Sequence, residues 1–128
     1  NLEWGRDNRT TGIRVPISSA AARRVENRLP GMDTNPYLGI AATLACGYLG
    51  LMNKVAPRPE FSGNAYIDSD EIPTTMGDAL DLLEEDAALT EVMGTDFCKV
   101  YDSVKRNEYK EFLQVISPWE RQHLLLNV

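Results

Sequence analysis

The chain has 128 residues, of which 43% are hydrophobic and 25% charged, and its formal net charge is −6. This length suits one domain with a modest core, and the composition excludes a disordered chain. The charge is uneven, because residues 1–28 hold six arginines and three acids whereas the rest is strongly acidic. A small basic patch favours a compact anion as ligand and argues against nucleic acid, which usually meets a broad basic face.

Two short strands are the first elements that the sequence predicts. Residues 9–16 and 23–29 alternate weakly, and the short loop between them is typical of an antiparallel hairpin. In the second strand Arg24, Glu26 and Arg28 are spaced by two, so an extended backbone would place all three on one face. Placing two guanidiniums beside one carboxylate on one face costs free energy unless a bound anion or metal ion helps to balance the charges.

A helix follows from Asn35 to about Lys54. Asn35 is a favoured N-cap and Pro36 a favoured first helical residue. The 20 residues between Asp33 and Lys54 carry no charge, which is near the length of a membrane span. Their glycines, alanines and polar residues favour a helix buried in a protein core instead. We therefore expect no membrane partner.

Residues 55–73 are predicted to be a long irregular loop, and three helices follow it. Thr75 is expected to cap the first of these, and Gly94 to end that region. The next helix is expected to run from a Thr95 cap to about Ile116. Its apolar stripe is predicted to be Phe97, Val100, Tyr101, Val104, Phe112, Val115 and Ile116.

The last predicted helix opens with a capping box. Ser117, Pro118 and Glu120 match its pattern, with proline at the first helical position. Glu108 falls on the stripe of the preceding helix, so we expect it to pair with a buried base or a backbone donor.

Four further side chains have chemistry of their own. Tyr66 lies in the long loop and is either an anchor for that loop or a contact or modification site. His123 has no catalytic partner nearby in the sequence, so a structural or surface role is expected. Cys46 and Cys98 sit in apolar helical patterns, which favours two buried free thiols and a reducing compartment.

Three motifs in order give the chain a family resemblance. The stretches NRTTGIRVP, RRVENRLPG and NPYL, within residues 8–38, resemble the C-terminal part of the glutamine synthetase family. The likeness continues more loosely to the chain end. The resemblance implies an α+β fold, in which a β-hairpin joins a larger antiparallel sheet and a mainly helical C-terminal portion follows. Residues 1–128 would be a fragment of one catalytic domain, with an active-site hairpin at 1–31 and a helical portion at 35–128.

The family joins glutamate to ammonia at the expense of ATP, through γ-glutamyl phosphate. The resemblance implies that Arg9 contacts both the transferring phosphate and glutamate, and that Arg14 holds ATP phosphates. Arg24 would lie close to the phosphates and share the catalytic role of Arg9. Glu26 would be one ligand of Mg²⁺ or Mn²⁺, and Arg28 would bind the side-chain carboxylate of glutamate.

Two departures from the family pattern concern the nucleotide and a modification. The loop at residues 18–22 lacks the lysine that the family often carries there. The surroundings of Tyr66, Gly63 to Asp68, match the family's adenylylation motif poorly, so the modification is not carried over.

The acceptor amine and the rest of the site remain open. The Gly12–Val15 variant, and Trp119 to Arg121 followed by Leu124 to Leu126, look closer to γ-glutamylpolyamine synthetases than to ammonia enzymes. The remaining family ligands would come from a missing N-terminal part of the same cytoplasmic protein, in a ring-forming homo-oligomer. We therefore expect the fragment to be inactive alone. The alternative is a non-catalytic helical module that binds an anion only structurally.

Overall fold

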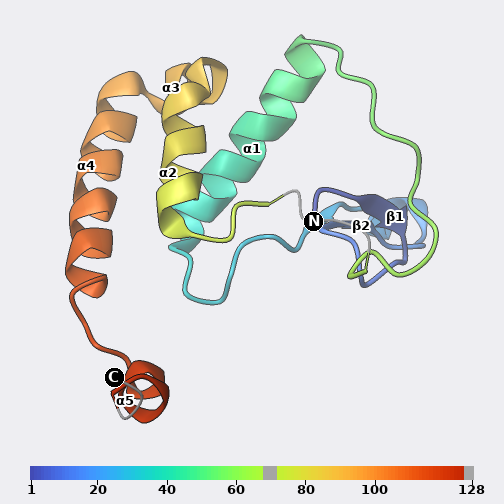
Figure 1. Ribbon diagram of the computed structural model, residues 1–128. Coiled ribbons are helices and arrows are strands. Elements are labelled where there is room, and N and C mark those ends of the chain that lie inside the picture. The colour runs from blue at the N-terminus through green and yellow to red at the C-terminus, as the bar shows by residue number, and fades with distance from the viewer. Residues whose placement is uncertain (68–71, 126–128) are drawn as a thin grey trace. The chain divides into compact units, whose positions relative to one another are not determined.

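The structure is a computed structural model that describes residues 1–67 and 72–125 (Figure 1). It divides into two compact units, Asn1–Thr74 and Thr75–Val128. Asp68, at the end of the stretch around Tyr66, and Leu126, the last of the C-terminal leucines named above, lie outside the described residues. Among the described residues, the first unit holds the small sheet, the short 3-10 helix η1 (Ala20–Ala22) and one α-helix, and the second holds four α-helices. An α+β fold dominated by helices is confirmed.

The sheet of the first unit has three short strands. They are β1 (Trp4–Arg6), β2 (Ile13–Val15) and β3 (Glu26–Asn27), in the order β1-β2-β3. β2 pairs with β3 in the antiparallel sense, which confirms the hairpin. β1 pairs with β2 in parallel and was not predicted, because three residues are too few to show a period.

Both hairpin strands are shorter than predicted. Before β2, Asn8 Oδ1 accepts hydrogen bonds from the backbone N–H and the hydroxyl of Thr10, at 3.0 and 2.7 Å. This Asx turn takes the backbone out of the extended conformation. Arg24 and Arg28 lie outside β3. The prediction that strand pleating places them on one face with Glu26 is therefore wrong.

The predicted irregular loop has no helix or strand in its described part, 55–67 and 72–73, yet it is fastened to the sheet. The Phe61 N–H donates to the Trp4 carbonyl at 2.9 Å, and Asn8 Nδ2 donates to the Gly63 carbonyl at 3.0 Å. Ala65 is fully buried. Tyr66 is 71% exposed, and its hydroxyl donates to the Arg9 carbonyl at 3.3 Å.

The helix of the first unit, α1 (Pro36–Met52), begins as predicted. Asn35 Oδ1 accepts from the backbone N–H groups of Tyr37 and Leu38. The expectation of a fully buried helix is wrong for this chain, since Ala45 is its only buried residue. Leu44 and Leu51 are 67% and 82% exposed. None of the described helices is long and apolar enough to cross a membrane.

The second unit contains α2 (Met76–Glu85), α3 (Ala87–Met93), α4 (Thr95–Phe112) and α5 (Pro118–His123). Figure 1 shows α2 and α4 side by side in opposite directions, with α3 linking their ends. Thr75 caps α2 as predicted. Gly94 has a φ of +99°, which suits glycine and ends the α2–α3 region as predicted. The break between α2 and α3 at Asp86 was not predicted.

Three predictions about the C-terminal helices need correction. α4 ends at Phe112, not Ile116, and Gly94 rather than Thr95 is its N-cap. Its predicted stripe is not its packing face, because Cys98 is the buried residue of α4 whereas Val100 is 65% exposed. The α5 capping box is present as predicted.

Glu108 and the cysteines also differ from expectation. Glu108 is exposed and pairs with Lys105 at 2.6 Å, one turn away on the same helix, so the buried-partner prediction is wrong. Both cysteines are free thiols, but only Cys98 is buried. Cys46 is exposed on α1 because that helix is largely uncovered.

Candidate functional site

Arg14 and Glu26 form the centre of the candidate site. They are directly opposite each other in the antiparallel β2–β3 register, so their side chains leave the same face of the sheet. Arg14 Nη1 donates to Glu26 Oε2 at 2.9 Å. The pair follows from two short strands that bring together residues 12 positions apart in the sequence.

Arg24 approaches the same carboxylate from the end of the hairpin loop. Its Nε and Nη2 lie 3.0 and 2.9 Å from Glu26 Oε1. Each oxygen of Glu26 therefore has one arginine partner. The hydrogen bond from Arg14, together with that from Arg24, holds the pKa of Glu26 below its ordinary range although partial burial opposes the shift. Glu26 is an ionised oxygen donor at neutral pH.

Asp7 contacts Arg14 from the other side and was not singled out in the sequence. Arg14 Nη2 forms an ion pair with Asp7 Oδ1. The hydrogen bonds of Glu26 and Asp7 raise the pKa of Arg14. The Arg14 side chain is only 16% exposed. An acid just past the end of an unrecognised strand carried no sequence signal, because its contact depends on the β1–β2 pairing.

Arg28 and Arg9 make a second group beside the first. Arg28 Nη1 donates to the backbone carbonyls of Arg9 and Thr11, so the hairpin brings Arg28 against the backbone of Arg9. Arg9 is exposed and has no carboxylate partner among residues 1–67 and 72–125. The structure thus brings Arg14, Arg24 and Glu26 into one cluster and leaves Arg9 and Arg28 outside its ion pairs.

The donor set fits a divalent ion only in part. Carboxylate oxygens are the ligands that Mg²⁺ prefers, and Glu26 supplies two of them. No group of three or more His, Cys, Asp or Glu side chains that could hold a metal lies in the described part of the chain. A metal at Glu26 would therefore need oxygen ligands from elsewhere.

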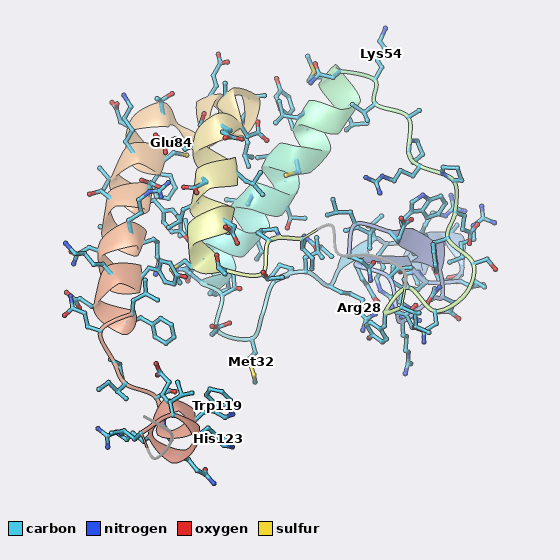
Figure 2. All side chains as sticks on the ribbon, in the orientation of Figure 1. Arg28, Met32, Lys54, Glu84, Trp119 and His123 are labelled. Atoms are coloured by element: carbon cyan, nitrogen blue, oxygen red, sulfur yellow. The ribbon has the colours of Figure 1, made fainter. Side chains whose placement is uncertain are left out.

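His123 and Trp119 lie outside this site, in the other unit. Their rings stack with centroids 4.7 Å apart, and His123 Nδ1 is 3.0 Å from the Trp119 carbonyl (Figure 2). One turn of α5 separates the two residues, which explains the contact locally. These contacts within α5 agree with the expected structural or surface role of His123.

Residues 1–124 match the family model of the glutamine synthetase catalytic domain. The chain is 38% identical over 124 residues to a glutamate–isopropylamine ligase of Pseudomonas, covering 94% of this chain and 27% of that protein. It is 35% identical over 125 residues to the gamma-glutamylputrescine synthetase of Escherichia coli, with coverages of 97% and 26%.

A solved structure agrees with the sequence relatives. Apo GmaS without ligand has a TM-score of 0.80 and 30% identity, and the match covers 96% of this chain and 29% of that one. The chain thus spans roughly a quarter of the length of the relatives it matches. The matched residues 1–124 include the arginine and carboxylate residues described above.

Proposed function

The chain belongs to the glutamine synthetase family, and we propose that the full-length protein containing it is an ATP-dependent ligase. The reaction joins the side-chain carboxylate of glutamate to ammonia or a small amine, through γ-glutamyl phosphate. The single observation that carries the proposal is Glu26 held between Arg14 and Arg24. This arrangement combines a hard oxygen donor with permanent positive charge on one small surface.

Phosphoryl transfer makes few covalent demands on a protein. It needs the reacting groups to be positioned and the spreading negative charge to be neutralised. Arginine suits both needs, because its guanidinium is always charged and can fork onto two oxygens. We assign phosphate contacts to Arg14 and Arg24. Glutamate contacts are assigned to Arg28, with Arg9 between the two substrates.

Glu26 is proposed as one ligand of Mg²⁺ or Mn²⁺. A divalent ion there would neutralise charge on the phosphate oxygens of ATP. The lowered pKa of Glu26 supports this role, because the carboxylate is ionised and ready to bind a cation. The remaining ligands would be donated by the rest of the protein.

The acceptor is proposed to be a small organic amine. Relatives named for isopropylamine, ethanolamide and putrescine are 35–38% identical to this chain. The glutamine synthetases of Methanocaldococcus jannaschii and Halobacterium salinarum are each 32% identical. The relatives named for organic amines are thus a few per cent more identical to this chain than these two glutamine synthetases are, which supports an organic amine over ammonia.

The remaining partners and the location are proposals of the same kind. Residues 1–128 are proposed as one part of a catalytic domain, and the ring-forming homo-oligomer would complete the site. The free thiols of Cys46 and Cys98 and the use of ATP support a cytoplasmic location. By itself the 128-residue chain is expected to form no γ-glutamyl amide.

Replacement of Glu26 tests the function. In the full-length protein, Glu26→Ala is expected to lower metal-dependent turnover at least about 100-fold, because even an outer-shell partner of a metal is worth about 10–100-fold. Glu60→Gln is the matched control, since Glu60 is an exposed acid of the same unit that pairs with Arg6. Near-normal turnover of a folded Glu26→Ala protein would contradict the role of Glu26 as a metal ligand. No amide formation by the unmodified full-length protein would favour the non-catalytic module.

A further inference from the structure

Asp7 has a backbone conformation that few residues other than glycine adopt. Its φ is +52°, in the left-handed region, where aspartate is tolerated better than most residues. The Asp7 N–H donates to the Val15 carbonyl at 3.0 Å, which extends the β1–β2 pairing by one residue. An uncommon conformation held by the surrounding structure is a reason to look for a role of the side chain it aims.

The side chain of Asp7 reaches Arg14, one residue before Val15 on the neighbouring strand. Arg14 has five N–H donors in a rigid fork. Glu26 takes one donor on Nη1 and Asp7 takes one on Nη2. Within residues 1–67 and 72–125, the second N–H of each terminal nitrogen has no protein acceptor. Two carboxylates on different nitrogens fix the orientation of the guanidinium more firmly than either does alone.

The two carboxylates are not equivalent. Glu26 also binds Arg24, through its other oxygen, and it is the proposed metal ligand. A divalent cation on Glu26 would compete with the arginines for its oxygens and repel their charge. Asp7 has Arg14 as its ion-pair partner in the described part of the chain. Asp7 can therefore hold Arg14 while Glu26 is engaged elsewhere.

We propose that Asp7 is a positioning residue, which keeps the guanidinium of Arg14 aimed at the phosphate site independently of Glu26. The inference rests on the proposed function for the identity of the anion, a nucleotide phosphate. The holding of Arg14 by Asp7 is a property of this chain and can be measured without any turnover. Asp7 acts through Arg14 and does not itself touch the substrate.

The first test follows the side chain of Arg14 by ¹⁵N NMR in the folded 128-residue chain. The readout is the hydrogen exchange and rotation rate of its guanidinium. In Glu26→Gln we expect these rates to stay within about twofold of the unmodified chain. In Asp7→Asn with Glu26→Gln we expect roughly a tenfold increase, the scale of one hydrogen bond to a charged group. Asn preserves the size and backbone tolerance of Asp7.

Release of Arg14 by Glu26→Gln alone would overturn the proposal, as would unchanged rates in the double variant. Should the separate chain not fold, a crystal structure of full-length Glu26→Gln gives the same decision. Arg14 against Asp7 supports the proposal, and Arg14 swung away from Asp7 contradicts it. Neither readout requires ligase activity, so failure of the proposed function would be seen separately.

The second test measures kinetics of the full-length protein. Asp7→Asn is expected to raise the KM for ATP roughly tenfold, with a smaller change in kcat and none in the KM for glutamate. Asp7→Glu should restore part of the loss, because it keeps the charge. Glu60→Gln, the control, should leave all three constants unchanged. A uniform loss of kcat with unchanged KM for ATP would contradict a role in aiming Arg14.

Discussion

Arg14 lies directly opposite Glu26 across the β2–β3 pair, with Nη1 at 2.9 Å from Oε2. Arg24 reaches the other oxygen of the same carboxylate, at 2.9 Å from Nη2. The hairpin thus places Glu26 between Arg24, two residues earlier in the sequence, and Arg14, 12 residues earlier. Most of the chemistry proposed for this protein depends on that arrangement.

The first unit should lose stability in acid because of Glu26. Its pKa in the folded state is lowered below the unfolded value of 4.5, chiefly by the Arg14 hydrogen bond. The stabilising contribution is therefore present above pH 4.5 and lost as the pH falls through the lower folded-state pKa. Glu26→Gln should reduce this acid sensitivity.

Trp4 fluorescence measures this loss, because Trp4 lies in β1 and the other tryptophan, Trp119, can be replaced by phenylalanine. Urea unfolding at pH 7 and pH 3 gives the free energy of unfolding at each. Glu120→Gln is the comparison, because Glu120 has a pKa lowered mainly by the Ser117 backbone in the other unit. An unchanged pH dependence in Glu26→Gln would contradict the assignment.

The cap of α2 should be worth about 1 kcal/mol. Thr75 Oγ1 accepts a hydrogen bond from the Asp78 N–H at 3.1 Å, and alanine would leave that donor to water. Thr75→Ala is expected to lower the free energy of unfolding by this amount, measured by circular dichroism in urea. Thr74→Ala, one residue earlier and exposed, should change it by less than about 0.5 kcal/mol. Equal effects of both substitutions would rule out the cap.

Local signals in the sequence predicted the starts of α1, α2 and α5, whereas the start of α3 was missed and the cap of α4 was placed one residue late. Asn35–Pro36, Thr75 and Ser117–Glu120 each act within one turn, so their effect does not depend on the rest of the fold. The β2–β3 hairpin was also predictable from its short loop. Among the site residues, the pairing of Arg14 with Glu26 was not predicted, although it follows from the register of that hairpin.

Burial and the third strand could not be predicted because they depend on distant contacts. The absence of charge in α1 indicates a buried helix. In the described structure, however, most of α1 is not covered by other residues. The prediction that the apolar stripe of α4 is its packing face was wrong for the same reason, because packing depends on contacts with other elements. Asp7 reaches Arg14 only because β1 pairs with β2, and the three-residue β1 has no period of its own.

The uncovered face of α1 should make the 128-residue chain associate. Tyr37, Leu44 and Leu51 are 84%, 67% and 82% exposed on a helix without charge. Exposed apolar patches of this kind promote association in water. Leu51→Glu is expected to shift the chain towards monomer in sedimentation velocity runs over a concentration series. Ile17→Glu adds the same charge at an exposed residue outside α1, and an equal shift there would show a general charge effect.

Arg28 and Arg14 should affect different substrates of the ligase that we propose for the full-length protein. Lysine keeps the charge but loses the fork of donors. Arg28→Lys is expected to raise the KM for glutamate, and Arg14→Lys the KM for ATP, each by roughly tenfold. Arg23→Lys, at an exposed neighbour of Arg24, should change neither. Steady-state kinetics with each substrate varied in turn makes the comparison, and a common loss in both variants would contradict separate roles.

Product formation by the full-length protein tests the central claim most directly. The protein would be incubated with glutamate, ATP, Mg²⁺ and, in turn, ammonia, isopropylamine, ethanolamine and putrescine. Mass spectrometry would measure the γ-glutamyl amide, and a coupled assay would measure ADP. The account predicts equal amounts of amide and ADP with at least one amine, and loss of both in Glu26→Ala. No amide with any acceptor, or an unchanged yield in Glu26→Ala, would contradict it.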